Sequence, residues 1–179
     1  MNFKKILSFV LALSVCAMLL CSCNKNTDVP EGMQLVSSDY IDCKFFVPKD
    51  WTPEIATGIL VAKASDNSNV SIQKMNPSGN YKSADDYFRT DYLPKITSTY
   101  KNVTLLEEES SIENQKFGTI GNGAVKYVYT VESDGSVYKI MQYFSVYSGY
   151  LYILTYTAEQ SVFASHLEEV GSIVNNFVY

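Results

Sequence analysis

Residues 124–157 read AVKYVYTVESDGSVYKIMQYFSVYSGYLYILTYT, and this stretch decides the fold. It contains runs of Val, Ile, Tyr, Phe and Thr, which suit a pleated and partly buried surface. The runs are separated by Ser133-Asp134-Gly135 and Ser148-Gly149, and turns this short join neighbouring antiparallel strands. The stretch therefore predicts an antiparallel meander with strands at Ala124 to Val131, Val137 to Val146 and Tyr150 to Thr157.

The middle strand of the meander carries large side chains on both faces. Alternation places Tyr138, Ile140, Phe144 and Val146 on one face and Met141 and Tyr143 on the other. Apolar side chains on both faces of a sheet need cover on both sides. We therefore expect an α+β fold in which helices flank an antiparallel sheet.

Further strands are predicted before the meander. Short runs of similar composition lie at Cys43 to Val47, Ile59 to Ala64, Val70 to Lys74 and Val103 to Ile112. Pro48 ends the first of these runs, and the next residues to Trp51 form a turn. The segment 65–69 is rich in Asn and Asp, which predicts a hairpin between the second and third runs.

A helix is predicted between the early strands and residue 103. Ser83, with Asp86 three residues later, is typical of a helix N-terminus. Phe88, Tyr92 and Ile96 then fall on one helical face, and Tyr100 continues that face if the helix does. Pro94 lies inside this pattern, so we expect a kink there, or one helix ending and another turn beginning.

The chain ends in a second predicted helix, from Ser161 to Asn175. Phe163, Leu167, Val170 and Val174 form its apolar stripe. We expect Leu167→Asp to unfold the domain, and we expect the adjacent His166 to be solvated, so that His166→Ala has no effect. Gly171 is unfavourable inside a helix, which suggests a close approach to the sheet there.

The first residues have the layout of an export signal. Lys4 and Lys5 precede an apolar run of 15 residues, from Ile6 to Leu20, which is too short for a permanent membrane span. The following Leu20-Cys21-Ser22-Cys23 resembles the lipobox of bacterial lipoproteins, and Cys23 follows a small residue, as a lipid acceptor must. We expect cleavage before Cys23 and lipid attachment to it; the alternative is an ordinary secreted protein cut near Ser22.

These features predict a signal peptide at residues 1–22, a flexible tether at 23–32 and a single domain at 33–179. The protein would then be anchored to the cell membrane by its lipid, on the extracytoplasmic face. Removal of the signal leaves 157 residues with a formal charge of −7, which disfavours nucleic acid as a partner. Cys43 would be alone, without a disulfide partner, and we interpret it as a buried strand residue rather than a reactive thiol.

Candidate catalytic and ligand sites are weak. His166 is the only histidine, which excludes sites built on paired histidines, and Gly-x-Ser-x-Gly is absent. Strand signals follow the glycine-rich segment 118–123, so we interpret it as a turn and not as a phosphate loop. Asp66, Asn67 and Asn69 lack the spacing of a calcium loop and fit a hairpin tip. Residues 107–109 are three glutamates that we interpret as a solvated strand edge.

The order of elements from Cys43 to Tyr179 resembles the PsbP-like superfamily. The resemblance rests on Phe45-Phe46-Val47-Pro48-Lys49-Asp50-Trp51, an aromatic strand followed by Pro, a polar pair and Trp. It rests also on the tail, where Thr155-Tyr156-Thr157-Ala158 leads into a helix and then Asn176-Phe177. These are packing motifs, so no functional residue is carried over. The resemblance implies a binding or assembly domain and makes an enzyme a weaker hypothesis.

Two functional hypotheses follow. The first is a tethered, non-catalytic binding module with no cofactor or metal, whose ligand or protein partner the sequence does not identify. The second is a small exported hydrolase that uses carboxylates alone, which would require two converging carboxylates with raised pKa values. The many tyrosines could stack on sugars or form an interface, but most are expected in the sheet.

Overall fold

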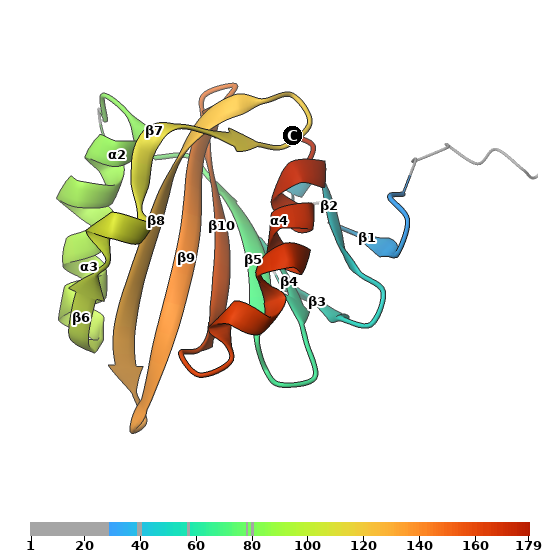
Figure 1. The fold of residues 1–179 in the computed structure, drawn as a ribbon. Coiled ribbons are helices and arrows are strands. Elements are labelled where there is room, and N and C mark those ends of the chain that lie inside the picture. Colours follow the sequence, from blue (N-terminus) through green and yellow to red (C-terminus); the bar gives the residue numbers. More distant parts are fainter. Residues whose placement is uncertain (1–28, 39–40, 57, 78, 80) are drawn as a thin grey trace, which may run out of the picture.

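The computed structural model describes residues 29–38, 41–56, 58–77, 79 and 81–179. The predicted signal peptide and Cys23 lie outside these ranges. An eight-stranded antiparallel sheet has the order β3-β4-β5-β10-β9-β8-β6, with β7 also paired to β8, and a separate hairpin joins β1 and β2 (Figure 1). The strands before the meander are β1 Met33–Ser38, β2 Ile41–Pro48, β3 Thr52–Ala56, β4 Ile59–Lys63, β5 Asn69–Met75, β6 Lys101–Leu105 and β7 Ser111–Phe117.

The predicted meander is confirmed and forms the centre of the sheet. Its strands are β8 Asn122–Ser133, β9 Ser136–Tyr147 and β10 Tyr150–Glu159. Both of its turns use left-handed backbone, with φ of 51° at Asp134 and 50° at Ser148, each followed by a glycine that also has positive φ. This backbone matches the twist of the strands, so the turns fix which strands are neighbours.

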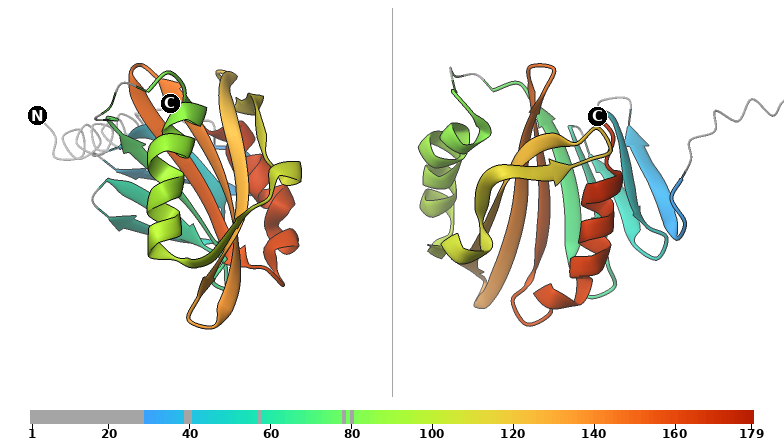
Figure 2. Two further views of the ribbon diagram at one scale, coloured as in Figure 1. Left: turned by 90° about the vertical axis from the view of Figure 1, so that its left-hand side faces the viewer. Right: turned by 45° about the horizontal axis from the view of Figure 1, so that its top comes forward.

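Both faces of the meander are covered, as its sequence predicts (Figures 1 and 2). On one side, here called the α4 face, the sheet packs against the β1–β2 hairpin and helix α4, Leu167–Asn176. On the other side, the α2 face, it packs against a helical segment made of α2 Ala84–Tyr87, η1 Phe88–Tyr92 and α3 Leu93–Thr99. The predicted α+β architecture, with one helical segment after the early strands and another at the C-terminus, is therefore confirmed.

The helical segment on the α2 face starts where the sequence predicts. Ser83 Oγ accepts a hydrogen bond of 3.0 Å from the Asp86 amide. Pro94 lies in the first turn of α3, where one helical element ends and the next begins, which is the second of the two expected outcomes. The preceding turn η1 is a π-helix, in which the Leu93 amide donates to the Phe88 carbonyl. Proline has no amide hydrogen to give to the carbonyl four residues earlier, and the wider turn accommodates that loss.

A buried amide holds this helical segment to the sheet. Gln142, which is 1% exposed, accepts a hydrogen bond from the Tyr129 hydroxyl at 2.9 Å. Its amide nitrogen donates to the Tyr92 hydroxyl at 2.7 Å and to Thr155 Oγ1 at 2.9 Å. Because a buried amide is costly unless its partners are in place, this network fixes how the helix sits on the strands.

The predicted strand from Val103 to Ile112 is wrong, since the structure divides it into β6 and β7. Residues 107–109 between them form a 3-10 turn, so the three glutamates are not a strand edge. The physical reason is a change of core: Val103 and Leu105 pack on the α2 face, whereas Leu106 packs on the α4 face. Strand β3, near the start of the domain, was not predicted because its five residues are all exposed.

The stripe of the C-terminal helix is partly wrong. Phe163, Val170 and Val174 are buried as predicted, but Leu167 is 42% exposed. The segment opens with a 3-10 turn, Phe163–His166, in which side chains three residues apart align. That turn aligns His166 with Phe163 and rotates Leu167 outward. Ile173, which the stripe omitted, is fully buried.

Gly171 does not mark a close approach, because a Cβ there would meet nothing within 4 Å. The close approach is at Gly118, in the turn after β7. A Cβ at Gly118 would lie 2.5 Å from the Phe177 carbonyl oxygen, and its φ of +73° also favours glycine.

His166 is not the solvated residue that the sequence predicts, since only 18% of its side chain is exposed. Its ring packs edge-on against Trp51, with centroids 5.3 Å apart. Nε2 lies 3.1 Å from Asp66 Oδ2 in the β4–β5 turn, and Nδ1 contacts the Glu169 carboxylate in α4. Burial alone would lower the pKa of His166, but the hydrogen bonds to Glu169 and Asp66 outweigh burial and raise that pKa.

We expect Val170→Asp to lower the free energy of unfolding by about 3 kcal/mol or more, because it buries an unpaired charge. Leu167→Asp, three residues away, serves as the control and should change the free energy of unfolding by about 0.5 kcal/mol or less. Urea denaturation of both variants measures the difference. Equal destabilisation by the two substitutions would contradict the phase assigned to α4.

We expect His166→Gln to reduce stability at pH 5.5 much more than at pH 9. A histidine whose pKa is raised by folding stabilises the fold fully below its unfolded pKa of about 6.5 and loses this effect as the pH rises through the folded value. Urea denaturation at both pH values measures the effect, with Ser165→Gln as the exposed control. A stability loss that is independent of pH would show that the ion pairs contribute nothing.

Candidate functional site

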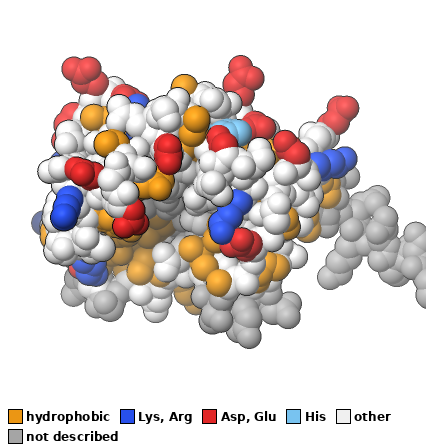
Figure 3. Space-filling model, turned by 90° about the horizontal axis from the view of Figure 1, so that it is seen from below, with side chains coloured by type: hydrophobic (Ala, Val, Ile, Leu, Met, Phe, Trp, Pro, Cys, Tyr) orange, Lys and Arg blue, Asp and Glu red, His pale blue; other side chains and the backbone are white. Residues whose placement is uncertain are grey.

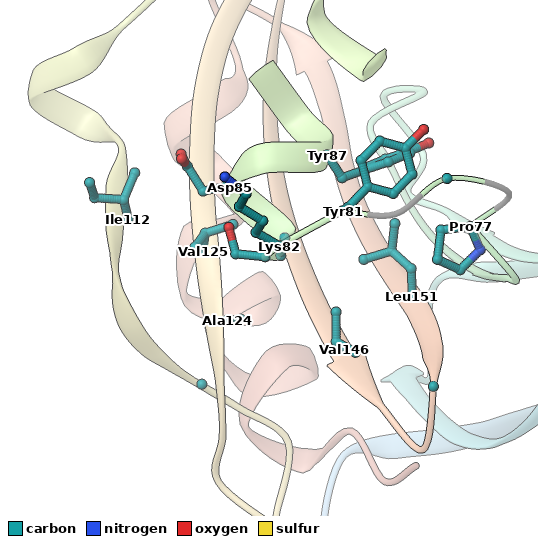
Figure 4. A pocket seen from close by; sticks show the side chains of 15 residues that line it. Pro77, Tyr81, Lys82, Asp85, Tyr87, Ile112, Ala124, Val125, Val146 and Leu151 are labelled. Carbon is teal, nitrogen blue, oxygen red and sulfur yellow. The ribbon is translucent and has the colours of Figure 1, made fainter. Parts of the chain in front are cut away.

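The helical cover on the α2 face is shorter than the sheet beneath it. Helix α2 begins at Ala84. The sheet extends past this end of the helix, and there Val146 on β9 pairs with Leu151 on β10, which in turn pairs with Met75 on β5. A groove of about 510 Å³ opens there, with the start of α2 on one side and the first part of β7 on the other (Figure 4). Strands β8, β9 and β10 form its floor.

The floor of this groove is aliphatic. On the floor, Val146 is 51% exposed, Val125 is half-buried and Leu151 is fully buried, and Ile112 on the β7 side is 58% exposed. Figure 4 shows these side chains gathered around the groove, with Tyr81 and Tyr87 on the side of the helical segment. Exposed aliphatic side chains that share a concave surface are typical of binding sites.

Among the described residues, the rim of the groove carries one acidic residue, Asp85, and one basic residue, Lys82, and only Asp85 forms an ion pair. Asp85 accepts a hydrogen bond of 2.9 Å from Arg89 Nε and another from the Tyr127 hydroxyl. Burial and the contact with Asp85 raise the pKa of Tyr127, so this hydroxyl remains a donor. Lys82, on the same rim, forms no ion pair with any residue that the structure describes.

A second lysine lies beside the groove on the β7 side. Lys116 is the register partner of Gly123, which lines the groove, and it is exposed. Within the described ranges it too forms no ion pair. Among the described residues, the groove thus has a lysine without an ion-pair partner on each of two sides, in a chain of net charge −5.

A smaller cavity lies at the opposite end of the α2 face, past the end of α3. It measures about 240 Å³ and is lined by Tyr100, Val131 and Ile140 among others. Seen from below, hydrophobic side chains line a hollow on this side of the molecule, with both acidic and basic side chains around it (Figure 3). Tyr100, which was expected to extend the helical stripe, is 43% exposed. The groove at α2 is the larger of these two, at about 510 Å³.

The other segments singled out in the sequence serve the fold. The turn Gly118–Gly121 joins β7 to β8, as predicted, and its Gly118 and Thr119 amides donate to the Val174 and Phe177 carbonyls, both at 2.9 Å. They are therefore not available to a phosphate group. The tip between β4 and β5 is the predicted hairpin, with Asn67 at φ 69° and the Ser68 amide donating to Asp66 at 2.9 Å.

His166 and Asp66, the candidate catalytic side chains among the described residues, are engaged in contacts within the fold. Both ring nitrogens of His166 face carboxylates, so the ring cannot act as a free general base. Burial opposes ionisation of Asp66, but hydrogen bonds from Ser68 and His166 lower its pKa, whereas a general acid needs a raised value. In the described part of the chain, no group of three or more His, Cys, Asp and Glu side chains could hold a metal ion.

Cys43 lies in β2 and is half-buried, packed against the core of the α4 face. Burial, with a smaller contribution from the nearby Asp42, raises the pKa of its thiol to about 12. The thiolate is the reactive form, and it is suppressed here. Cys43 is thus a strand residue with a suppressed thiolate, as interpreted from the sequence, but it is half-buried and not fully buried.

Sequence reasoning missed the groove residues Lys82, Ile112 and Val146. The alternation of β9 does place Val146 on the same face as Ile140 and Phe144, which was predicted. It gave no sign that the helix would leave this row uncovered, because that depends on where α2 lies in space. Lys82 carried no signal in the sequence beyond its position next to the helix cap.

No protein-family model matches the sequence, and no curated protein matches it. Solved structures do match in fold. The cyanobacterial PsbP protein CyanoP of Synechocystis has a TM-score of 0.58 at 16% identity, covering 90% of this chain and 99% of its own. The Ran-binding protein Mog1p of Saccharomyces cerevisiae has a TM-score of 0.55 at 10% identity, covering 81% and 94%.

A protein of unknown function from Pseudomonas aeruginosa has a TM-score of 0.51 at 16% identity, covering 78% of this chain and 92% of its own. At such identities the likeness concerns the fold and not the activity. None of the described helices is long and apolar enough to cross a membrane. The antiparallel sheet between two helical layers is thus the fold of PsbP, as the strand and tail motifs predicted.

Proposed function

We propose that this chain is a lipid-anchored, non-catalytic binding module of the extracytoplasmic membrane surface, and that its ligand binds in the groove beyond the start of α2. The observation that carries the proposal is the groove itself. It combines an exposed aliphatic floor around Val146 with the unpaired Lys82 on its rim.

The described side chains support binding over catalysis. A carboxylate hydrolase would need two converging carboxylates, one of them with a raised pKa. Asp66 and Glu169 do converge, but on His166, and the pKa of Asp66 is lowered. In the groove, Asp85 is engaged by Arg89 and Tyr127. The structural neighbours are compatible with a binding role, since Mog1p is named as a Ran-binding protein.

The anchor is supported by the sequence at Cys23. Met33, where β1 begins, is ten positions after Cys23, and a chain of that length spans at most about 35 Å. A lipid on Cys23 would therefore hold the domain close to the bilayer. Ligands in or near the membrane surface would be within its reach.

We expect Cys23→Ala to abolish lipid attachment, because acylation requires that sulfur. Incorporation of a labelled fatty acid into the protein in its own cells measures the effect. Cys16→Ala, inside the apolar run of the signal, is the control and should leave incorporation unchanged. Labelling of the Cys23→Ala protein at the wild-type level would exclude the proposed anchor.

We expect Val146→Glu to abolish ligand capture, since it places a charge on the aliphatic floor. The intact protein is extracted from membranes in polymer-bounded discs without detergent, and bound molecules are identified by mass spectrometry. Val137→Glu is the matched control, because Val137 lies in the same strand, is 45% exposed and is far from the groove. A bound molecule retained equally by both variants would show that the groove is not the binding site.

A further inference from the structure

We propose that the ligand of the groove is a single-chain anionic amphiphile, with an aliphatic chain on the floor and a carboxylate head beside Lys82. This inference rests on the proposed function and assigns a chemical class to its ligand. The floor of the groove is aliphatic, and the strand edge beside it is poorly suited to pairing with a peptide. The lysines near the rim have no ion-pair partner among the described residues.

The floor offers aliphatic contact, and its strands are paired with one another within the sheet. Beneath the groove, the backbone of β8, β9 and β10 is paired within the sheet, with Ala124 opposite Ser145 and Val146 opposite Leu151. A ligand on this floor therefore meets Val125, Val146 and the exposed Ile112. An aliphatic chain loses no hydrogen bonds there, because it has none to satisfy.

An extended peptide fits the groove less well, because its backbone would need a free strand edge. The strand beside the groove, β7, has a register shift between Ser111 and Gln115, and such bulges disrupt edge pairing. The Gln115 side-chain amide also contacts the Glu113 carbonyl, at 3.4 Å. A peptide in this position would leave several of its own amides unsatisfied.

The charges beside the groove favour an anionic head. Lys82 lies on the α2 side and Lys116 on the β7 side, and neither has an ion-pair partner in the part of the chain that is described. The rim carboxylate, Asp85, is bound to Arg89 and Tyr127 and is not needed to neutralise either lysine. A carboxylate at the end of an aliphatic chain complements this arrangement.

The test uses the full-length protein in membranes of its own cells and a photoactivatable palmitic acid. After irradiation, we expect cross-links on residues 122–147, which include the floor strands β8 and β9, and competition by unlabelled palmitate. Val146→Glu should lower the labelling about tenfold, while Val137→Glu should leave it unchanged. Folding of each variant is checked by its thermal unfolding transition.

Two further arms test the head group and the source of the chain. Lys82→Glu should weaken labelling several-fold, whereas Lys101→Glu, an equal charge change at an exposed lysine on β6, should not. A photoactivatable fatty alcohol should label less than the acid. Added vesicles of phosphatidylglycerol should compete poorly, because the inferred ligand has one chain.

The outcomes separate this inference from the proposed function. Labelling that is unaffected by Val146→Glu, or equal labelling by acid and alcohol, would overturn the assignment of an anionic amphiphile. If a peptide or another molecule were instead captured in a manner that depends on Val146, the binding module would stand and its ligand class would be wrong. If nothing were captured through the groove, both would fall.

Discussion

The meander of β8, β9 and β10 imposes the constraint on which the rest of the structure depends, because it is apolar on both faces. Met141 and Tyr156 project to one side, while Phe144 and Ile153 project to the other. Such a sheet is stable only when both faces are removed from water. The α4 face is closed by α4 with the β1–β2 hairpin, and the α2 face is closed by the segment from α2 to α3.

The two covers are not equally complete. On the α2 face, the segment of α2, η1 and α3 crosses strands that are 10 to 12 residues long and leaves sheet rows uncovered beyond its ends. Gln142 holds the segment at the middle of the sheet through Tyr92, which prevents it from sliding toward either end. The aliphatic row at Val146 therefore stays open, and the candidate site is a consequence of how the cover is positioned.

The C-terminal segment shows how a local change of helix type redistributes side chains. A regular α-helix from Phe163 would bury Leu167 and expose His166. The 3-10 turn at its start shortens the spacing from four residues to three, so His166 reaches Trp51 and Asp66 while Leu167 faces solvent. The lone histidine thereby joins the β4–β5 turn to α4.

The sequence by itself determined the meander, its turns, the helix start at Ser83 and the fold class, because these depend on strand periodicity, turn residues and capping within short segments. The tertiary structure alone decided the break at Leu106, the phase of the C-terminal helix and the groove at Val146. Leu106 interrupts the predicted strand because its side chain packs on the α4 face, whereas Leu105 packs on the α2 face. The 3-10 turn of the C-terminal segment begins at Phe163, whose side chain is buried. Val146 is exposed only because of where α2 begins relative to the strand ends, and such a relation between distant segments is set by packing in three dimensions.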